Sequence, residues 1–277
     1  MEILLAKSAG FCFGVKRAVD MAFKTDSTKK TYTLGHIIHN ETVTHQLHEK
    51  GIESIEHMDH VPMDQLIIRA HGVPEEVYQE AYEKSVHVID ATCPYVTKIH
   101  KLVSRHEKEG FNIILIGDAN HPEIIGINGW TKKGCIILKN KSELDFSQLS
   151  QDARYFIVSQ TTYKKAVVDE IVEALEQAGY NIKFMNTICS ATSERQNEAR
   201  EMASQVEAMV VIGSRHSSNT QKLYEICGSL CPKTYCIDDA SMLKEEDFEG
   251  IEKVGVTAGA STPADVIDEV LTKLQQI

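Results

Sequence analysis

The sequence predicts an α/β fold of three similar small lobes in a pseudo-threefold arrangement around a central site. The first observation behind this prediction is a local pattern that occurs three times, in which an apolar run leads to a cysteine. These cysteines are Cys12, Cys93 and Cys189. The second observation is that a helical stretch follows each cysteine and leads to an apolar run closing on a glycine. These glycines are Gly35, Gly117 and Gly213. Repetition at this length indicates one structural unit used three times.

Polar side chains follow the apolar runs at matching positions. Shortly after the glycines come His39, His121 and Ser217, and Ser217 is followed by Ser218 and Asn219. A later apolar run in each unit delivers His71, Thr161 and Ser261. Because open α/β sheets build their sites at the carboxyl ends of strands, we expect these side chains to lie near the three cysteines. As hydrogen-bond donors from three lobes, they can surround an anion.

The stretches between the apolar runs show the periodicity of helices. Apolar residues recur at helical spacing over 15–23 and 96–103, and the last helix is expected over 263–275. Pro94 follows Cys93 as a first-turn proline, and Ser193 with Gln196 resembles a capping box. Each cysteine is therefore expected in a strand-to-helix turn.

These patterns predict lobes over 14–95, 96–191 and 192–277. Since the chain opens with a cysteine-bearing strand and its last unit ends in a helix, the segment 1–13 is expected to complete the sheet of the third lobe. Units of this size are viable when they share an interface.

Composition argues against several classes of protein. The 277 residues carry a formal net charge of -11, which argues against nucleic-acid or anionic-membrane partners because phosphate groups are bound by an excess of Lys and Arg. The sequence shows neither a stretch of about 18 apolar residues nor a signal-peptide pattern at Met1, so we expect a cytoplasmic protein with no membrane partner. Seven cysteines in a reducing compartment favour metal or redox use over disulfides.

The repeated cysteines are candidate metal ligands. The positive end of a helix dipole stabilises a thiolate, and three thiolates around one axis suit an iron-sulfur cluster or a zinc ion. A cubane cluster has four irons, so three protein thiolates leave one iron open to a substrate. The alternative is that the three cysteines only pack at strand ends. The cysteines outside the repeat are Cys135, Cys227, Cys231 and Cys236. Cys227 and Cys231, four apart on an expected helix, are interpreted as core residues.

Glu123 lies two residues after His121 in an HPE motif. A carboxylic acid at this place can supply protons to a reacting group. The same spacing also fits a first-turn carboxylate that only stabilises its helix. Both interpretations stay open on the residues alone.

Taken together, the motifs resemble those of the 4-hydroxy-3-methylbut-2-enyl diphosphate reductases, the last enzymes of the non-mevalonate isoprenoid pathway. The resemblance covers essentially the whole chain and is carried, in order, by AGFCFGVKRAV, HNE, RAHGV, DATCP, HPE, SQTT, GSRHSSN and TAGAS. It implies three α/β lobes around a central oxygen-sensitive [4Fe-4S] cluster held by Cys12, Cys93 and Cys189. It also implies that the substrate alcohol binds the open iron, and that reductive loss of water gives isopentenyl and dimethylallyl diphosphate.

The resemblance also implies roles for the polar residues. The diphosphate is held by His39, His71, Ser217, Asn219 and Ser261, with Ser218 beside them. The proton-transfer side consists of His121, Thr161 and Glu123, where His121 and Thr161 also contact the substrate and Glu123 donates the proton.

Two functions from other classes stay open on the residues alone. One is a zinc hydrolase with three thiolates and an open fourth position, and the other is a noncatalytic iron-sulfur sensor. Reductive removal of a hydroxyl group needs a redox cofactor, because no side chain supplies the electrons. The sequence shows no G-x-G-x-x-G fingerprint for a bound nicotinamide or flavin. An external electron donor such as ferredoxin or flavodoxin is therefore implied.

Overall fold

The computed structural model describes residues 1–59 and 61–277. Its strands are β1 (Glu2–Leu5), β2 (Thr31–Leu34), β3 (Glu53–Ile55), β4 (Gln65–Ile68), β5 (His87–Asp90), β6 (Asn112–Ile116), β7 (Ile136–Leu138), β8 (Arg154–Ser159), β9 (Asn181–Phe184), β10 (Ala208–Ile212), β11 (Thr234–Ile237) and β12 (Lys253–Ala258). Its α-helices are α1 (Phe13–Phe23), α2 (Glu41–Glu49), α3 (Glu75–Glu83), α4 (Pro94–Lys108), α5 (Pro122–Asn128), α6 (Lys165–Gln177), α7 (Ser190–Ala203), α8 (Ser218–Gly228) and α9 (Ala264–Leu274).

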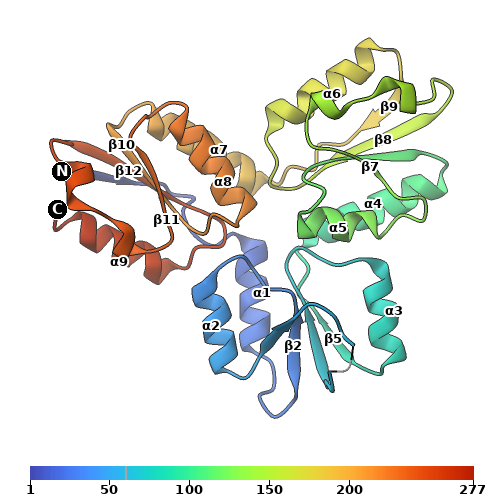
Figure 1. Cartoon of the computed structure of the whole chain (residues 1–277), viewed down its shortest axis with the longest axis horizontal. Coiled ribbons are helices and arrows are strands. Elements are labelled where there is room, and N and C mark those ends of the chain that lie inside the picture. The colour runs from blue at the N-terminus through green and yellow to red at the C-terminus, as the bar shows by residue number, and fades with distance from the viewer. Residues whose placement is uncertain (60) are drawn as a thin grey trace. The chain divides into compact units, whose positions relative to one another are not determined.

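The strands form three four-stranded parallel sheets, which confirms the three α/β lobes expected from the sequence. The strand order repeats: β3-β2-β4-β5 in the first sheet, β7-β6-β8-β9 in the second and β11-β10-β12-β1 in the third. Strand β1 therefore takes, in the third sheet, the edge position that β5 and β9 take in the others. Helices cover both faces of each sheet (Figure 1), as parallel sheets require.

Alternating side chains of the central strands pack on the two helical layers. On β10, Val210 and Ile212 belong to the cluster with α9, whereas Met209 and Val211 pack with α7 and α8. Successive side chains of a strand point to opposite faces, so a continuous apolar run is expected where both faces are covered. Each of these four side chains is fully buried, which stabilises the fold by roughly 1.5–3 kcal/mol per large apolar side chain.

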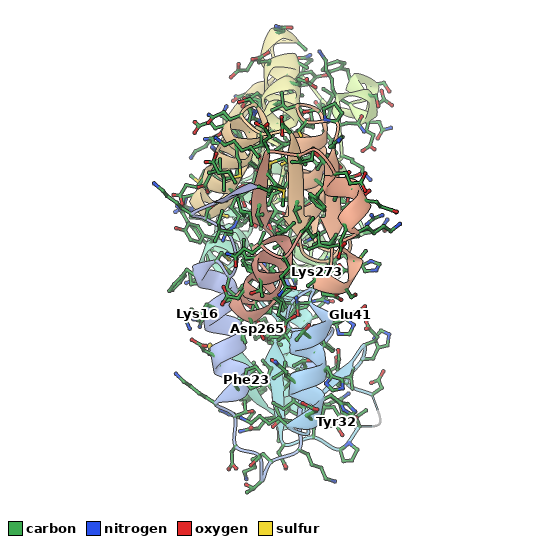
Figure 2. All side chains as sticks on the ribbon, turned by 90° about the vertical axis from the view of Figure 1, so that its left-hand side faces the viewer. Lys16, Phe23, Tyr32, Glu41, Asp265 and Lys273 are labelled. Carbon is green, nitrogen blue, oxygen red and sulfur yellow. The ribbon has the colours of Figure 1, made fainter. Side chains whose placement is uncertain are left out.

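Helices α1, α4 and α7 begin directly after the three repeat cysteines, as the repeat predicts. The proline expected in a first turn, Pro94, is the first residue of α4. In the first lobe, α1 and α2 lie near each other, because Lys50, just after α2, donates a hydrogen bond to the carbonyl of Phe23 at the end of α1. Figure 2 marks Phe23 and Glu41, the first residue of α2.

Two local interpretations from the sequence are wrong. Ser193 and Gln196 do not form a capping box, because α7 starts directly after Cys189, and the Cys189 sulfur accepts the N–H of Thr192 at 3.3 Å as the N-cap. Cys231 does not share a helix with Cys227, because α8 ends before it. Both of these cysteines are nevertheless buried among apolar side chains, as expected.

Contacts divide the chain into two compact units. Unit 1 comprises Met1–Lys16, Ile38–Thr44 and Cys189–Ile277 and holds the third sheet. Unit 2 comprises Arg17–Ile37 and His45–Ile188 and holds the first and second sheets. Among the described residues, every helix is too short or too polar to cross a membrane.

Candidate functional site

The three repeat cysteines follow equivalent strands. Cys12 comes after β1, Cys93 after β5 and Cys189 after β9, and these strands hold the same edge position in their sheets. Cys93 and Cys189 are the N-caps of α4 and α7, and Cys12 directly precedes α1. All three thiols are only partly buried. Helix starts stabilise anions, so each thiol lies in a setting that suits a metal-ligating thiolate.

Backbone hydrogen bonds connect two of these cysteines to the second polar position of their lobes. The N–H of Cys93 donates to the carbonyl of Ala70 at 3.0 Å, and His71 is the next residue. The N–H of Cys12 donates at 3.2 Å to the carbonyl of the residue directly before Ser261. The same bond in two lobes places a cysteine and a polar residue together at the carboxyl ends of the strands.

The four cysteines outside the repeat have a different environment. Cys227, Cys231 and Cys236 are buried, and Cys135 is held 3.7 Å from the Thr131 hydroxyl. Burial raises the pKa of Cys135 to about 11 and that of Cys227 to about 12, and it also raises the pKa of Cys236. A thiol that stays protonated is a poor metal ligand, so these three cysteines do not compete with the repeated ones.

Arg195 is a further candidate site residue, which no pattern in the sequence indicates. Its buried guanidinium donates from Nη1 to the carbonyl of Ala191 at 3.1 Å and from Nη2 to the carbonyl of Gly10 at 2.6 Å. Burial lowers the pKa of Arg195, and the charges of Cys12 and Cys189 act in the opposite direction. The guanidinium therefore lies near both cysteines of unit 1. Local sequence carries no signal for this, because Gly10 and Arg195 are 185 residues apart.

Buried polar groups without partners gather at the polar positions of the third lobe. Ser217 caps α8, and its hydroxyl accepts the N–H of Thr220 at 3.4 Å. Within the part of the chain that the structure describes, both side-chain amide atoms of Asn219 and the hydroxyl of Ser261 are buried and lack a hydrogen-bond partner. Each such group costs about 1–3 kcal/mol when left unpaired. A polar ligand would remove this cost, so these atoms mark a candidate binding site.

His71 and His121 bring the first and second lobes together within unit 2. Their rings lie edge to face with the centroids 5.4 Å apart. His121 is the N-cap of α5, and its Nδ1 accepts the N–H of Glu123 at 3.1 Å. Because Nδ1 accepts, a neutral His121 ring carries its hydrogen on Nε2.

Glu123 is enclosed in the second lobe and pairs with Thr161. Only 2% of Glu123 is exposed. Its Oε1 accepts the N–H of Thr161 at 2.6 Å, and its Oε2 accepts the Thr161 hydroxyl at 2.7 Å. Burial raises the pKa of Glu123 to about 7, although the two hydrogen bonds from Thr161 act in the opposite direction. A carboxyl group with this pKa can donate a proton near neutral pH.

The structure distributes the residues predicted from the sequence over the two units. Unit 1 holds Cys12, His39, Cys189, Ser217, Ser218, Asn219 and Ser261. Unit 2 holds His71, Cys93, His121, Glu123 and Thr161. Within each unit the residues lie where strands end and helices begin, as the repeat predicts.

The amino-acid sequence matches known proteins over its full length. A model of the LytB protein family matches residues 3–275. The 4-hydroxy-3-methylbut-2-enyl diphosphate reductase of Clostridioides difficile (strain 630) is 44% identical over 282 residues, with 100% of both chains covered. The enzyme with the same name from Geobacter metallireducens is 43% identical over 279 residues, which cover 100% of this chain and 98% of that protein.

Solved structures give the same result. A structure of (E)-4-hydroxy-3-methyl-but-2-enyl diphosphate reductase, described as the terminal enzyme of the non-mevalonate pathway, aligns with a TM-score of 0.74 and 40% identity and covers 100% of both chains. The E-1-hydroxy-2-methyl-but-2-enyl-4-diphosphate reductase from Plasmodium falciparum aligns with a TM-score of 0.92 and 30% identity, covering 99% of this chain and 87% of that one.

Proposed function

Because the chain belongs to the LytB protein family, we propose that it reduces 4-hydroxy-3-methylbut-2-enyl diphosphate to isopentenyl diphosphate and dimethylallyl diphosphate. Two electrons and two protons enter, the carbon–oxygen bond to the hydroxyl group breaks, and one water leaves. The observation that carries the proposal is the equivalent placement of Cys12, Cys93 and Cys189 after β1, β5 and β9. The names of the full-length relatives support a reductase over a zinc hydrolase or a sensor.

The three repeat cysteines fit a [4Fe-4S] cluster. They are partly exposed thiols at helix starts, and thiolate sulfur is the preferred ligand of such clusters. Cys12, Cys93 and Cys189 would hold the cluster and leave one iron without a protein ligand. When bound, the cluster supplies electrons and a Lewis-acidic iron at the hydroxyl group of the substrate.

The lobe arrangement is part of the same proposal. The three lobes would span 14–95, 96–191 and 192–277, with 1–13 completing the third, around a pseudo-threefold axis. The pairing of β1 with β12 supports the role of the N-terminal segment. The repeated strand order supports a common orientation of the cysteine in each lobe.

The diphosphate group would bind to six side chains. These are His39, His71, Ser217, Ser218, Asn219 and Ser261. Support comes from the third lobe, where the buried amide of Asn219 and the hydroxyl of Ser261 can donate to phosphate oxygens. Hydrogen bonds to a charged acceptor are stronger than neutral ones, so donors of this kind can bind a diphosphate without Lys or Arg. The start of α8 adds the positive end of a helix dipole.

One proton would leave Glu123 through Thr161. In the protonated acid the hydrogen belongs on Oε2, because Oε1 faces the N–H of Thr161. The Oε2–H group then donates to the Thr161 hydroxyl, which donates its own hydrogen to the reacting group. His121, with its hydrogen on Nε2, would orient the substrate beside this pair.

The electrons would come from an external carrier such as ferredoxin or flavodoxin. A direct test is to purify the protein without oxygen, add the substrate and dithionite-reduced methyl viologen, and identify the products. Formation of isopentenyl and dimethylallyl diphosphate is expected, together with an electron paramagnetic resonance signal of the reduced protein that changes when substrate is added. A colourless zinc protein that releases phosphate, or a brown protein without turnover, would contradict the proposal.

A further inference from the structure

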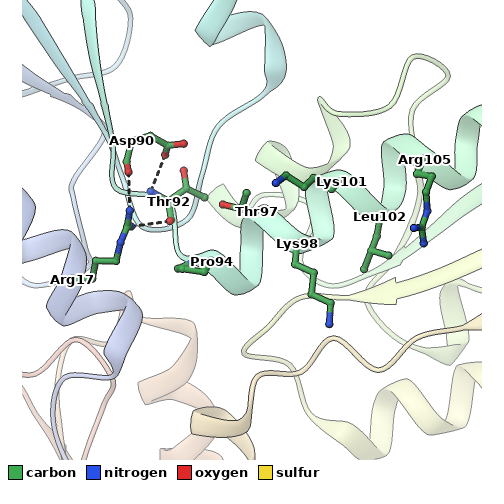
Figure 3. A pocket seen from close by; sticks show the side chains of 9 residues that line it. All are labelled: Arg17, Asp90, Thr92, Pro94, Thr97, Lys98, Lys101, Leu102 and Arg105. Carbon is green, nitrogen blue, oxygen red and sulfur yellow. Dashed lines mark hydrogen bonds between the residues drawn. The ribbon is translucent and has the colours of Figure 1, made fainter.

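A groove with four cationic side chains runs along α4 in unit 2. Its volume is about 710 Å³. It is lined by Arg17, Asp90, Thr92, Pro94, Thr97, Lys98, Lys101, Leu102 and Arg105 (Figure 3). None of the cations in this groove has a part in the proposed chemistry, so the groove needs a separate explanation.

The groove has a positive net charge, because its lining holds four cations and one carboxylate. Lys98, Lys101 and Arg105 are exposed and follow each other at helical spacing, so they share one flank of α4. The acidic lining residue, Asp90, accepts the N–H of Thr92 at 2.9 Å. Arg105 lies 3.7 Å from the carboxylate of a glutamate one turn further along, but an exposed pair of this kind neutralises little. The groove is therefore positive in a chain whose net charge is -11.

The groove begins beside a repeat cysteine. Pro94, which lines it, is the residue after Cys93, and α4 extends from there toward Arg105. Arg17 closes this end, because its guanidinium donates to the carbonyls of Thr92 at 3.1 Å and of Asp90 at 3.3 Å (Figure 3). At a rise of about 1.5 Å per residue, Lys98 and Lys101 lie within roughly 8–12 Å of Cys93 along the helix. A molecule bound here is close to a proposed cluster ligand.

The groove is better suited to a protein surface than to a small anion. Lys98, Lys101 and Arg105 are exposed side chains in a row, whereas a small anion is usually held by convergent and buried donors. Arg17, the less exposed cation, already donates to two backbone carbonyls. A row of exposed cations is typical of surfaces that steer and orient a partner of opposite charge.

We propose that the α4 groove is the docking surface for an acidic protein that carries one electron at a time. This inference rests on the proposed function, because only a reductase without its own nicotinamide or flavin needs such a partner. Each docked carrier gives up one electron and is oxidised by one electron. Two carriers serve one substrate, whose carbon–oxygen bond breaks while two protons enter and water leaves.

The test compares two electron donors on the anaerobically purified holoenzyme. The variant is Lys98→Glu combined with Lys101→Glu and Arg105→Glu. With a reduced acidic ferredoxin as donor, kcat/KM for the ferredoxin is expected to fall roughly 10- to 1,000-fold, the range over which charge steering changes association rates. With dithionite-reduced methyl viologen, turnover is expected to stay at the wild-type level, because this small donor needs no docking surface. In the wild type, added salt should weaken the ferredoxin reaction, and the variant should lose most of this salt dependence.

A matched variant controls for the change in total charge. Lys141→Glu combined with Lys233→Glu and Lys244→Glu makes the same change at exposed positions outside the groove and should keep the wild-type ferredoxin kinetics. Equal losses in both variants, an equal loss with methyl viologen, or unchanged ferredoxin kinetics in the groove variant would each overturn the proposal. The proposal would also be overturned if inorganic pyrophosphate bound the wild type but not the groove variant, and if ferredoxin did not compete with this binding.

Binding is also measured without turnover, by calorimetric titration of ferredoxin into each protein at low salt. If ferredoxin binds the wild type but not the groove variant, the docking surface is supported even if the wild type reduces no substrate. If the wild type turns over with methyl viologen but ferredoxin binds both proteins equally, only the docking surface is refuted. The two proposals can therefore fail separately.

Discussion

Replacing Glu123 by Gln tests whether this carboxyl group donates a proton. The amide has nearly the same shape, and it can still accept the N–H of Thr161 with its oxygen and donate to the Thr161 hydroxyl with its nitrogen. It cannot give up a proton. Turnover with methyl viologen should therefore fall by about two to four orders of magnitude, the usual contribution of a positioned acid. Substrate should still change the spectrum of the reduced protein.

The pKa of Glu123 also predicts how turnover changes with pH. Since burial raises the pKa of Glu123 to about 7, about half of the carboxyl groups are protonated at that pH, and wild-type turnover should decline as pH rises through it. The decline should be absent from the residual activity of Glu123→Gln. Persistence of the same decline in the variant would assign the titration to another group.

The raised pKa of Glu123 also predicts how much the free energy of unfolding changes with pH. The folded state keeps the Glu123 proton up to about pH 7, whereas the unfolded chain releases it above the ordinary value of 4.5. The unfolded state binds fewer protons in this window, so stability falls as pH rises from about 4.5 to 7, by about 3 kcal/mol in total. Glu123→Gln should escape this loss, so its free energy of unfolding should rise relative to the wild type between pH 4.5 and pH 8.

A matched control is Glu76→Gln, which changes a carboxylate at the second position of α3 as Glu123 is at the second position of α5. Glu76 is exposed, so its replacement should alter neither the turnover nor the pH dependence of stability. Near-normal turnover in Glu123→Gln would reduce Glu123 to a structural first-turn carboxylate. Loss of the substrate-induced spectral change would make it a binding residue instead.

Three further predictions concern the cluster, the anion and the buried His100 of α4. Cys189→Ser, like the same change at the other two repeat cysteines, should abolish iron retention and activity, while Cys227→Ser should keep both; iron analysis that gives the reverse would contradict the repeat argument. Asn219→Ala should raise KM by roughly 10- to 100-fold, the cost of about 1.5–3 kcal/mol for a lost hydrogen bond to a charged group, without changing the spectrum of the cluster; an unchanged KM would count against its contact with the diphosphate. Burial lowers the pKa of His100 from 6.5 to about 4, so the folded state resists a proton that the unfolded chain takes up, and stability should fall by about 3 kcal/mol as pH drops from 6.5 to 4. His100→Phe keeps a ring stacked on Trp130 and should lack this loss in denaturant titrations; an identical pH dependence in the variant would refute the assignment.

The repeat in the sequence predicted the three α/β lobes, which the three parallel sheets confirm. Apolar runs closing on glycine became the central strands β2, β6 and β10, and the second apolar run of each unit became the strand next to it. This worked because strands covered on both faces need continuous apolar sequence, which is visible without any tertiary information. The repeat also accounts for β1, since a third unit that lacks its last strand must take that strand from elsewhere in the chain. The resemblance to the reductase family is confirmed by the match to the LytB model.

Long-range polar contacts could not be predicted in the same way. Arg195 donates to the carbonyl of Gly10, and Glu198 accepts the hydroxyl of Ser8, over about 190 residues of sequence. Neither residue lies in a pattern that distinguishes it from an ordinary charge on a helix. The cap of α7 was also missed, because the cysteine sulfur takes the place usually held by a hydroxyl or carboxylate oxygen. The cations of the α4 groove likewise match the sequence of any solvated helix flank.

The sequence predicts the position of Glu123, but it does not predict the burial of its carboxyl group. Its spacing after His121 predicts a carboxylate in the first turn of a helix, and α5 has one there. Such carboxylates are usually exposed, and an exposed glutamate is ionised at neutral pH and cannot act as an acid. Only the pairing of β6 with β8 brings Thr161 across the second lobe to cover this carboxyl group. The burial that results is the main cause of the raised pKa, so the acid depends on a contact between residues that are 38 positions apart. If Thr161→Val leaves the pKa raised but stops turnover, the hydroxyl relays the proton; if turnover survives, the proton leaves Glu123 by another route.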